Sequence, residues 1–276
     1  MSTYPGSYRI KNVETGTYLT MTSTGSKTSV TCAQSESGDK KSLWQLVPAR
    51  DGKFKLKNVE HNLEAQTGQD FAMVGELKGH SWFIRDGTSG QKIIHTGKSN
   101  FVLEFVKVIL APPFFVAVLQ LKADKSQKSQ RWTFESAYAV PLAVYVIKNV
   151  KTGTVMDLAG AREGAGVQIF GYSFNGGGNQ KWDIKPGTGP LDITIRSVLT
   201  NAYAAYPTAQ QDENLQTSLE PQEFVITAAD KGYYISPVKR SDQVIDLAGA
   251  DAADGTRICL WVKENSDHQK WYFEQV

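Results

Sequence analysis

The sequence predicts an all-β protein made of many short strands in a closed barrel-like or sandwich architecture. Three observations support this fold class. Short β-prone segments alternate with Gly, Asn, Asp and Pro, no stretch keeps a helical period of 3.6 residues over a useful length, and the chain contains internal repeats. With 276 residues, of which 41% are hydrophobic and 21% charged, the chain is long enough for two domains that each bury a core.

The longest-range repeat relates the two halves of the chain. The segment 10–23, IKNVETGTYLTMTS, aligns with the segment 147–160, IKNVKTGTVMDLAG, at an offset of 137 residues. This offset is about half of the chain length, which indicates two related domains. We place the join near residues 136–141 and predict domains of residues 1–138 and 139–276.

A shorter period marks the ends of modules within each half. At six places a large aromatic residue follows a polar pair and precedes an apolar strand, at spacings of 38, 50, 50, 42 and 47 residues. The six aromatic residues are Trp44, Trp82, Trp132, Trp182, Phe224 and Trp271. A module of this size cannot bury its apolar face alone, so we predict that three modules share one core in each half. The repeated aromatic side chain is predicted to fill that core.

Strands inside the modules are predicted from the local pattern. The β-prone segments of the fourth module are residues 145–147, 155–156, 167–169 and 182–184. The apolar stretch of residues 101–121 resembles a membrane span, but Glu104, Lys107 and the Pro112-Pro113 pair interrupt it. Its uninterrupted pieces are too short to cross a bilayer, so we predict two strands packed in a core there, and no membrane insertion.

The repeat with the most chemical content relates residues 156–182 to residues 245–271, without a gap and at an offset of 89 residues. Both copies keep an Asp, an aromatic residue 15 positions later and a Gln 23 positions later. These residues are Asp157, Tyr172 and Gln180 in the first copy, and Asp246, Trp261 and Gln269 in the second. A turn-capping role alone does not explain the acid, because Thr20 takes its place in the first module. We interpret the repeat as two copies of one small binding site.

Module length, threefold grouping and the Gln-x-Trp ends together resemble the ricin B-type β-trefoil lectins, including the cytoplasmic lectins of mushrooms. The resemblance covers the organisation of the whole chain and is strongest in residues 139–186 and 232–276. It implies two tandem β-trefoil domains, each with three four-stranded modules around a pseudo-threefold axis. It also implies a non-enzymatic carbohydrate-binding protein, a fungal haemagglutinin, whose expected ligands are galactose or N-acetylgalactosamine ends of glycans on glycoproteins or glycolipids.

The resemblance assigns roles to the residues of both copies. The Asp accepts hydrogen bonds from two sugar hydroxyls, the aromatic ring stacks on the apolar face of the sugar, and the Gln orients the Asp from behind. The first implied site comprises Asp157, the backbone of Ala159 and Gly160, Tyr172, Asn179 and Gln180. The second comprises Asp246, the backbone of Ala248 and Gly249, Trp261, His268 and Gln269. Phe170 and Phe174 are alternative stacking rings in the first site, and His268 departs from the usual Asn.

Elementary chemistry favours the same roles. A carboxylate can accept hydrogen bonds from both hydroxyls of a vicinal diol, and a hydrogen bond to a charged group contributes about 1.5–3 kcal/mol. A Tyr or Trp ring is a flat partner for the axial C–H face of a pyranose, and glycine after the acid lets backbone amides approach the ligand. The sequence has no His/Cys cluster and no acids at calcium-loop spacing, so we expect no metal and no cofactor.

Two other classes of function stay open at this point. Asp157 and Asp246 form a conceivable acid pair for glycosidic cleavage, which needs carboxyl groups about 5–9.5 Å apart, but equivalent positions on a threefold scaffold point away from each other. A protein-binding trefoil, such as a fungal protease inhibitor, would use variable loops such as residues 34–41 or 206–215. The N-terminal half has no obvious sugar sites, and the alternatives for it are a scaffold, a homodimer surface or a binder of another ligand.

Composition narrows the remaining classes of function. A net charge of +2 gives no electrostatic reason to expect nucleic acid or an acidic membrane as a partner. Cys32 and Cys259 are expected to be buried free thiols. The first ten residues show no basic region followed by an apolar run, so we expect no signal peptide and a cytoplasmic location.

Overall fold

A computed structural model describes residues 6–36, 38–97, 100–111, 114–208 and 210–276 of the chain. The chain divides into two compact units, Met1–Ala137 and Tyr138–Val276. Each unit contains one 12-stranded sheet, and the described residues form no α-helix. Residues 1–5 and the Pro112-Pro113 pair, which entered the predictions above, lie outside the described residues.

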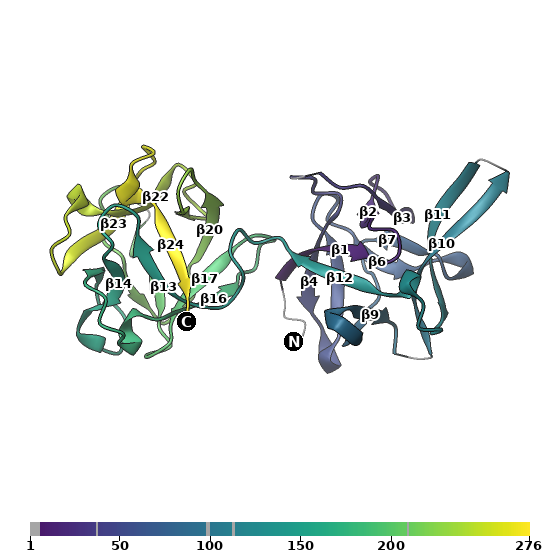
Figure 1. The fold of residues 1–276 in the computed structure, drawn as a ribbon, viewed down its shortest axis with the longest axis horizontal. Coiled ribbons are helices and arrows are strands. Elements are labelled where there is room, and N and C mark those ends of the chain that lie inside the picture. The colour runs from purple at the N-terminus through teal and green to yellow at the C-terminus, as the bar shows by residue number, and fades with distance from the viewer. Residues whose placement is uncertain (1–5, 37, 98–99, 112–113, 209) are drawn as a thin grey trace. The chain divides into compact units, whose positions relative to one another are not determined.

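Six strands close a barrel in the first unit (Figure 1). They pair in the order β1, β4, β5, β8, β9 and β12, and β12 pairs with β1. Strands β5 and β8 join through the isolated bridge between Phe54 and Trp82. The barrel strands are β1 (Gly6–Asn12), β4 (Leu43–Pro48), β5 (Phe54–Asn58), β8 (Phe83–Asp86), β9 (Lys92–His95) and β12 (Trp132–Ser136).

The second unit repeats this barrel with its own strands. The pairing order is β13, β16, β17, β20, β21 and β24, and β24 closes on β13. These strands are β13 (Val144–Asn149), β16 (Trp182–Pro186), β17 (Ile193–Ser197), β20 (Glu223–Ala228), β21 (Tyr233–Pro237) and β24 (Trp271–Gln275). All of these pairings are antiparallel, and they join strands consecutive in the chain, such as β16 with β17, as well as strands far apart in it, such as β13 with β24.

Each module adds one hairpin to its two barrel strands. The hairpins of the first unit are β2 (Tyr18–Met21) with β3 (Thr28–Ala33), β6 (Glu64–Thr67) with β7 (Met73–Glu76), and β10 (Phe101–Ala111) with β11 (Phe114–Ala123). Those of the second are β14 (Val155–Leu158) with β15 (Ile169–Tyr172), β18 (Tyr203–Ala205) with β19 (Gln216–Ser218), and β22 (Gln243–Leu247) with β23 (Thr256–Val262). Three four-stranded modules around one barrel make a β-trefoil, so the predicted fold class is confirmed.

The aromatic residues at the six module ends are fully buried and belong to two separate core clusters, one in each unit. Each of the five tryptophans also donates its indole N–H to a backbone carbonyl 2.9–3.1 Å away. The acceptors are the carbonyl groups of Leu19, Ala65, Leu103, Met156 and Ile245. Each acceptor lies on the first strand of a hairpin, so the tryptophan ties the hairpin to the barrel and satisfies its own buried polar atom.

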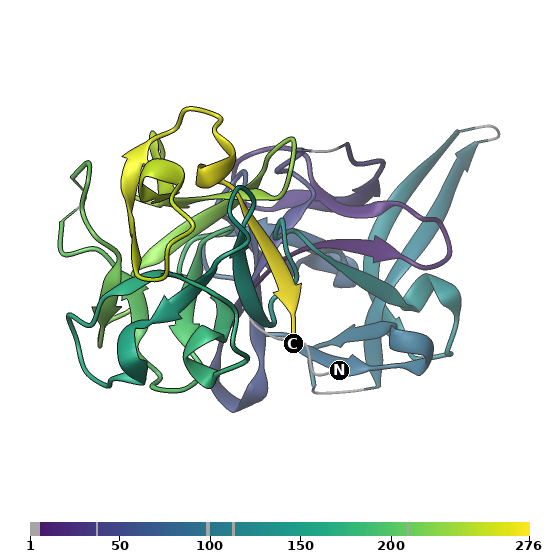
Figure 2. The same ribbon diagram turned by 60° about the vertical axis from the view of Figure 1, so that its left-hand side comes forward.

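Two strand predictions need correction. The predicted strand at residues 167–169 begins only at Ile169, because the backbone N–H of Val167 donates to Thr217 Oγ1 and Gln168 bridges to Gln216 instead. The stretch 101–121 does form two strands, as predicted, but its hairpin extends beyond the rest of the first unit (Figure 1, Figure 2). Among the residues of this hairpin whose side chains the structure describes, Val102, Leu103, Leu119 and Leu121 at its base are buried.

The two cysteines are free and buried, as predicted. Burial raises the pKa of each thiol to about 12, so both are protonated at neutral pH and are poor nucleophiles. No helix in the described part of the chain is long and apolar enough to cross a membrane.

Candidate functional site

Asp157 lies on β14 with its carboxylate almost fully buried, at 3% exposure. Its Oδ1 accepts a hydrogen bond from Asn179 Nδ2 at 2.9 Å, and its Oδ2 accepts one from Gln180 Nε2 at 2.8 Å. Gln180 is held in turn, because its Nε2 also donates to the Ser173 carbonyl and its Oε1 accepts the N–H of Asn175. The amide of Gln180 therefore holds the carboxylate from its buried side, the contact that the resemblance implies.

The chain turns sharply just after this acid. Ala159–Ala161 form a single 3₁₀ turn, in which Gly160 has a φ of 60° and Ala161 a φ of 55°. Two successive left-handed residues are uncommon outside glycine. A Cβ at position 160 would contact only the Arg162 side chain, at 3.8 Å or more. The backbone of Gly160 therefore stays open to an approaching ligand.

Strand register determines where the predicted stacking residue lies. In the β14–β15 ladder Asp157 pairs with Phe170 and Val155 pairs with Tyr172, so the acid and both aromatic rings lie on the same face of the hairpin. The Phe170 and Tyr172 ring centroids are 5.8 Å apart. Phe174 follows the strand and is 60% exposed. Register thus brings Tyr172 to the face of the acid, and Phe170 remains an alternative ring.

The second copy reproduces this arrangement around Asp246 on β22, which is also almost fully buried. Gln269 Nε2 donates to Asp246 Oδ2 at 2.9 Å, and its other contacts match those of Gln180. His268 replaces Asn179, and its Nε2 lies 3.3 Å from Asp246 Oδ2. Trp261 shares the face of Asp246, because the β22–β23 ladder pairs Asp246 with Cys259 and Val244 with Trp261.

A cavity of about 300 Å³ opens over the second copy. It is lined by Asp212, Asp246, Ala248, Gly249, Arg257, Cys259, Trp261 and His268. Five of the six predicted residues therefore meet in one cavity, while Gln269 is fully buried behind the acid. Asp212 and Arg257, which no sequence pattern indicates, form an ion pair of 2.8 Å at the wall.

Burial raises the pKa of both carboxyl groups. For Asp157 the hydrogen bonds from Gln180 and Asn179 oppose this rise in the pKa, and the nearby charge of Asp254 adds to it. For Asp246 the hydrogen bond from Gln269 and the charge of His268 oppose the rise, while Glu264 adds to it. Each ionised acid therefore lacks part of its hydration, and hydroxyl donors from a ligand would stabilise it.

A third copy of the acid–amide network, which the repeat spacing does not predict, lies in the first unit. Gln130 Nε2 donates to Glu104 Oε2 at 2.7 Å and to the Ala123 carbonyl at 2.7 Å, and its Oε1 accepts the N–H of Lys125. Register places Lys122 opposite Val102, where the other copies have Tyr172 or Trp261. This module keeps the carboxylate and its orienting amide but has no stacking ring.

Residues 206–215, one of the two loops considered above for a protein-binding trefoil, are fixed at both ends. Tyr206 and Leu215 are buried, whereas Pro207, Thr208 and residues 210–212 are exposed, and position 209 lies outside the described residues. The backbone also binds β23 through the N–H of Asp212 to the Leu260 carbonyl and the N–H of Leu215 to the Ile258 carbonyl. This segment supplies Asp212 to the wall of the second cavity. The other loop, residues 34–41, includes position 37, which lies outside the described residues.

No group of three or more His, Cys, Asp or Glu side chains in the described ranges is arranged to hold a metal ion. The acids at both copies are bonded to amide groups instead. The chemistry that these side chains offer is therefore hydrogen bonding and ring stacking.

Two barrels of three modules, with a buried acid and its orienting amide on the hairpins, define a β-trefoil of the ricin type. The chain belongs to the ricin-type β-trefoil lectin domain-like family, whose family model matches residues 2–75 and 128–214. The matched residues include the first copy of the site. The second copy lies beyond them.

Several solved structures are similar to this chain. An agglutinin of Rhizoctonia solani is 33% identical, with a TM-score of 0.49, over 51% of this chain and 100% of that one. A ricin B-like lectin of Macrolepiota procera, in complex with lactose, is 28% identical, with a TM-score of 0.45, over 51% and 100%. The C-half of the earthworm R-type lectin, in complex with GalNAc, is 21% identical, with a TM-score of 0.40, over 49% and 99%. No curated protein matches the chain.

Proposed function

We propose that this protein is a non-enzymatic lectin that binds carbohydrate at two sites in its second unit, one at Asp157 and one at Asp246. The observation that carries the proposal is the repeated buried acid, held by an amide donor from the Gln-x-Trp segment at 2.8–2.9 Å in both copies. Membership of a lectin-like family supports it.

The proposed binding uses the hydrogen-bond acceptor positions of the carboxylate that the side-chain amides do not occupy. A carboxylate offers about four acceptor positions, and at Asp157 one amide donor occupies a position on each oxygen. Two adjacent hydroxyls of a sugar would take the remaining positions. The backbone of Ala159 and Gly160 would line one side of the sugar, and Tyr172 would cover its C–H face.

The second site would use the same parts with Trp261 as the ring. Asp212 and Arg257 extend its cavity wall, so we propose that this site contacts the sugar beyond the first ring. As galactose and N-acetylgalactosamine ends are the expected ligands of the ricin B-type lectins, we propose them for both sites.

Calorimetric titration with galactose and N-acetylgalactosamine tests this assignment. Substitution of Asp157→Asn or Asp246→Asn should each remove one of two binding events, whereas Asp183→Asn, at a partly exposed acid on β16, should remove none. A reducing-sugar assay on glycan substrates should show no turnover in any of these proteins. Two intact binding events in both site variants, or glycan cleavage by the wild type, would contradict the proposal.

A further inference from the structure

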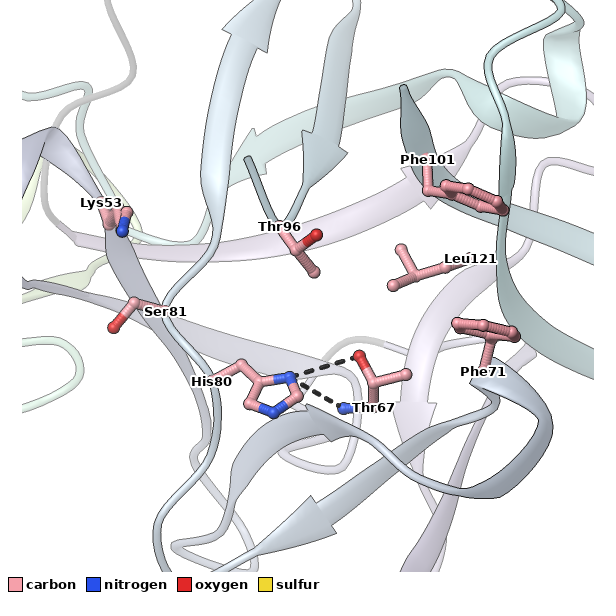
Figure 3. Close-up of a pocket in the computed structure, with 8 residues that line it drawn as sticks. All are labelled: Lys53, Thr67, Phe71, His80, Ser81, Thr96, Phe101 and Leu121. Carbon is pink, nitrogen blue, oxygen red and sulfur yellow. Dashed lines mark hydrogen bonds between the residues drawn. The ribbon is translucent and has the colours of Figure 1, made fainter. Parts of the chain in front are cut away.

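A cavity of about 490 Å³, larger than the one at Asp246, lies in the first unit (Figure 3). Both proposed sugar sites belong to the second unit. The volume of this cavity is in the range of small-molecule pockets, about 300–1,000 Å³. The residues that line it are Lys53, Thr67, Phe71, His80, Ser81, Thr96, Phe101 and Leu121. None of them belongs to a predicted sugar site, and the proposed function does not use this cavity.

The cavity exists because the second module has a smaller side chain and a shorter loop than the fourth module at matching positions. The β5–β6 pairing of Lys57 with Glu64 corresponds to the β13–β14 pairing of Lys148 with Val155, which places Thr67 where the fourth module has the core residue Leu158. The connection after Thr67, residues 68–72, is also shorter than residues 159–168 after Leu158. A smaller side chain and a shorter loop leave volume that the fourth module fills.

His80 replaces the glutamine of the Gln-x-Trp segment in the second module. Its Nδ1 accepts the backbone N–H of Thr67 at 3.2 Å (Figure 3). The imidazole is thus turned toward the hairpin at the cavity wall. The second module has lost the glutamine that orients the acid elsewhere, and it presents a different lining.

One side of the cavity is apolar. Figure 3 shows Phe71, Phe101 and Leu121 grouped together there, and the two phenyl rings stack with centroids 5.8 Å apart. Phe71 is 58% exposed and Phe101 37% exposed, which is unfavourable for rings of this size. Phe71 also has a φ of 60°, a left-handed conformation that is rare for a bulky side chain. The turn therefore holds a large apolar ring at the cavity against its conformational preference.

The opposite side is polar and carries a cation. Figure 3 shows Lys53 and Ser81 there, with Thr96 between the two sides. Lys53 is the one permanently charged side chain among the described residues that line the cavity. Its Nζ lies 5.0 Å from the centroid of the Phe83 ring, a contact that holds the ammonium group near the opening.

From this lining we infer that the cavity binds small amphipathic carboxylates with an aromatic or alkyl body. The body packs against Phe71, Phe101 and Leu121, which covers apolar surface that is now exposed. The carboxylate pairs with Lys53 and accepts hydrogen bonds from the hydroxyl groups of Ser81 and Thr96. Because this site and the sugar sites share no residue, its occupancy is independent of sugar binding.

Titration of the full chain with 4-phenylbutyrate, at low ionic strength, tests this inference. Three comparison ligands separate its parts: 4-phenylbutanol lacks the charge, butyrate lacks the ring, and lactose is a sugar. We expect 4-phenylbutyrate to bind at least about tenfold more tightly than 4-phenylbutanol or butyrate. Lactose should not displace it. In ¹H–¹³C spectra the methyl signals of Leu121 should shift on binding.

Variants locate the two ends of the ligand. Lys53→Gln should weaken 4-phenylbutyrate by about tenfold and leave 4-phenylbutanol unchanged, and Phe71→Ala should weaken both. Lys78→Gln, at an exposed lysine of the same module, is the matched control and should change neither. The Asp157→Asn/Asp246→Asn variant should bind the acid as the wild type does, even if sugar binding fails altogether. No binding at millimolar concentration, equal affinity for acid and alcohol, or displacement by lactose would overturn the inference.

Discussion

Asp157 and Asp246 are buried acids, and their burial makes both the stability of the fold and the affinity for sugar depend on pH. Because burial raises the pKa of each carboxyl in the folded chain, its contribution to stability is fully present below the unfolded pKa of about 3.9 and is lost as the pH rises through the folded pKa. The pH dependence of sugar affinity has the opposite sign, because only the ionised carboxylate accepts hydrogen bonds from both sugar hydroxyls.

We therefore expect sugar affinity to be constant at neutral pH and to fall as the pH decreases through these raised pKa values. The measurement is calorimetric titration at a series of pH values, with near-ultraviolet circular dichroism to show that the protein stays folded. Affinity that remains constant down to about pH 4, near the ordinary pKa of Asp, would contradict a role for the buried acids.

His268 should make the two sites differ. Its Nε2 lies 3.3 Å from Asp246 Oδ2, the oxygen that Gln269 also binds, whereas Asn179 donates to the other oxygen of Asp157. We expect His268→Asn to change the affinity of the second site, measured in the Asp157→Asn background. The first site, measured in the Asp246→Asn background, should keep its affinity. An unchanged affinity at the second site would remove this role of His268.

At the residue scale, an acid can be predicted from the sequence where its spacing to the glutamine is preserved, and cannot be predicted where that spacing differs. Asp157 and Asp246 stand out because each precedes its glutamine by 23 residues. Glu104 precedes Gln130 by 26 residues, since a longer hairpin separates them, so the repeat does not align there. Asp212 has no local signal at all, because the packing of its segment on β23 brings it to the site.

At the scale of elements, the turn after each acid decides how closely a ligand can approach. Gly160 and Gly249 have φ values of 60° and 63°. We expect Gly160→Val to cost about 1–2 kcal/mol of stability, because a β-branched residue is disfavoured in the left-handed region, and to abolish binding at the first site. Denaturant unfolding and titration of the Asp246→Asn background measure both effects.

The control for this turn is Gly52→Val, at a φ of 69° in the first unit with open space around the added side chain. It carries a similar backbone cost without a proposed sugar site nearby. Sugar affinity that falls equally in both variants would mean that the turn acts through stability and not through ligand approach.

The tryptophans at the module ends connect elements. Trp182 is fully buried and donates to the Met156 carbonyl at 2.9 Å. We expect Trp182→Phe to lower the free energy of unfolding of the second unit by roughly 2–4 kcal/mol, because it leaves a cavity and an unpaired carbonyl. Trp261→Phe, outside the core, should change the free energy of unfolding little and weaken the second site. Equal destabilisation by the two substitutions would contradict the distinction between core and site rings.

Element boundaries were predicted well where the pattern is local. The strand around Val155 follows from its β-branched and apolar residues, and β14 forms there. The predicted strand at residues 167–169 was wrong at its start, because pairing with β19 takes Gln168 out of the β14–β15 ladder. The length of the β10–β11 hairpin beyond the core was also not predictable, since periodicity does not distinguish a projecting hairpin from a buried one.

At the scale of the whole molecule, the two proposed sites lie on one compact unit, an arrangement that favours multivalent binding. Avidity gains of about 10²–10⁴ are possible when two sites engage one surface together. We expect the wild type to agglutinate beads that carry clustered galactose ends, and either single-site variant to bind free galactose but fail to agglutinate. Agglutination by a single-site variant would show that further sites or self-association supply the second contact.

The first unit shares the fold and lacks the complete site. It keeps the network of Glu104 and Gln130 without a stacking ring, and it carries the cavity at Phe71 and Lys53. The sequence predicted the fold of this unit from its tryptophans, but the cavity depends on a short loop and on one polar residue at a core position. Both the short loop and the polar residue, Thr67, are recognised only when strand register aligns the second module with the fourth.

The proposed lectin function depends on Asp157 and Asp246. The most direct test is a glycan array that compares the wild type with an Asp157→Asn/Asp246→Asn variant of equal unfolding midpoint. We expect the wild type to bind a coherent set of galactose-ended or N-acetylgalactosamine-ended glycans and the variant to lose that whole set. A wild type that binds no glycan, or a variant that binds the same set, would contradict the claim.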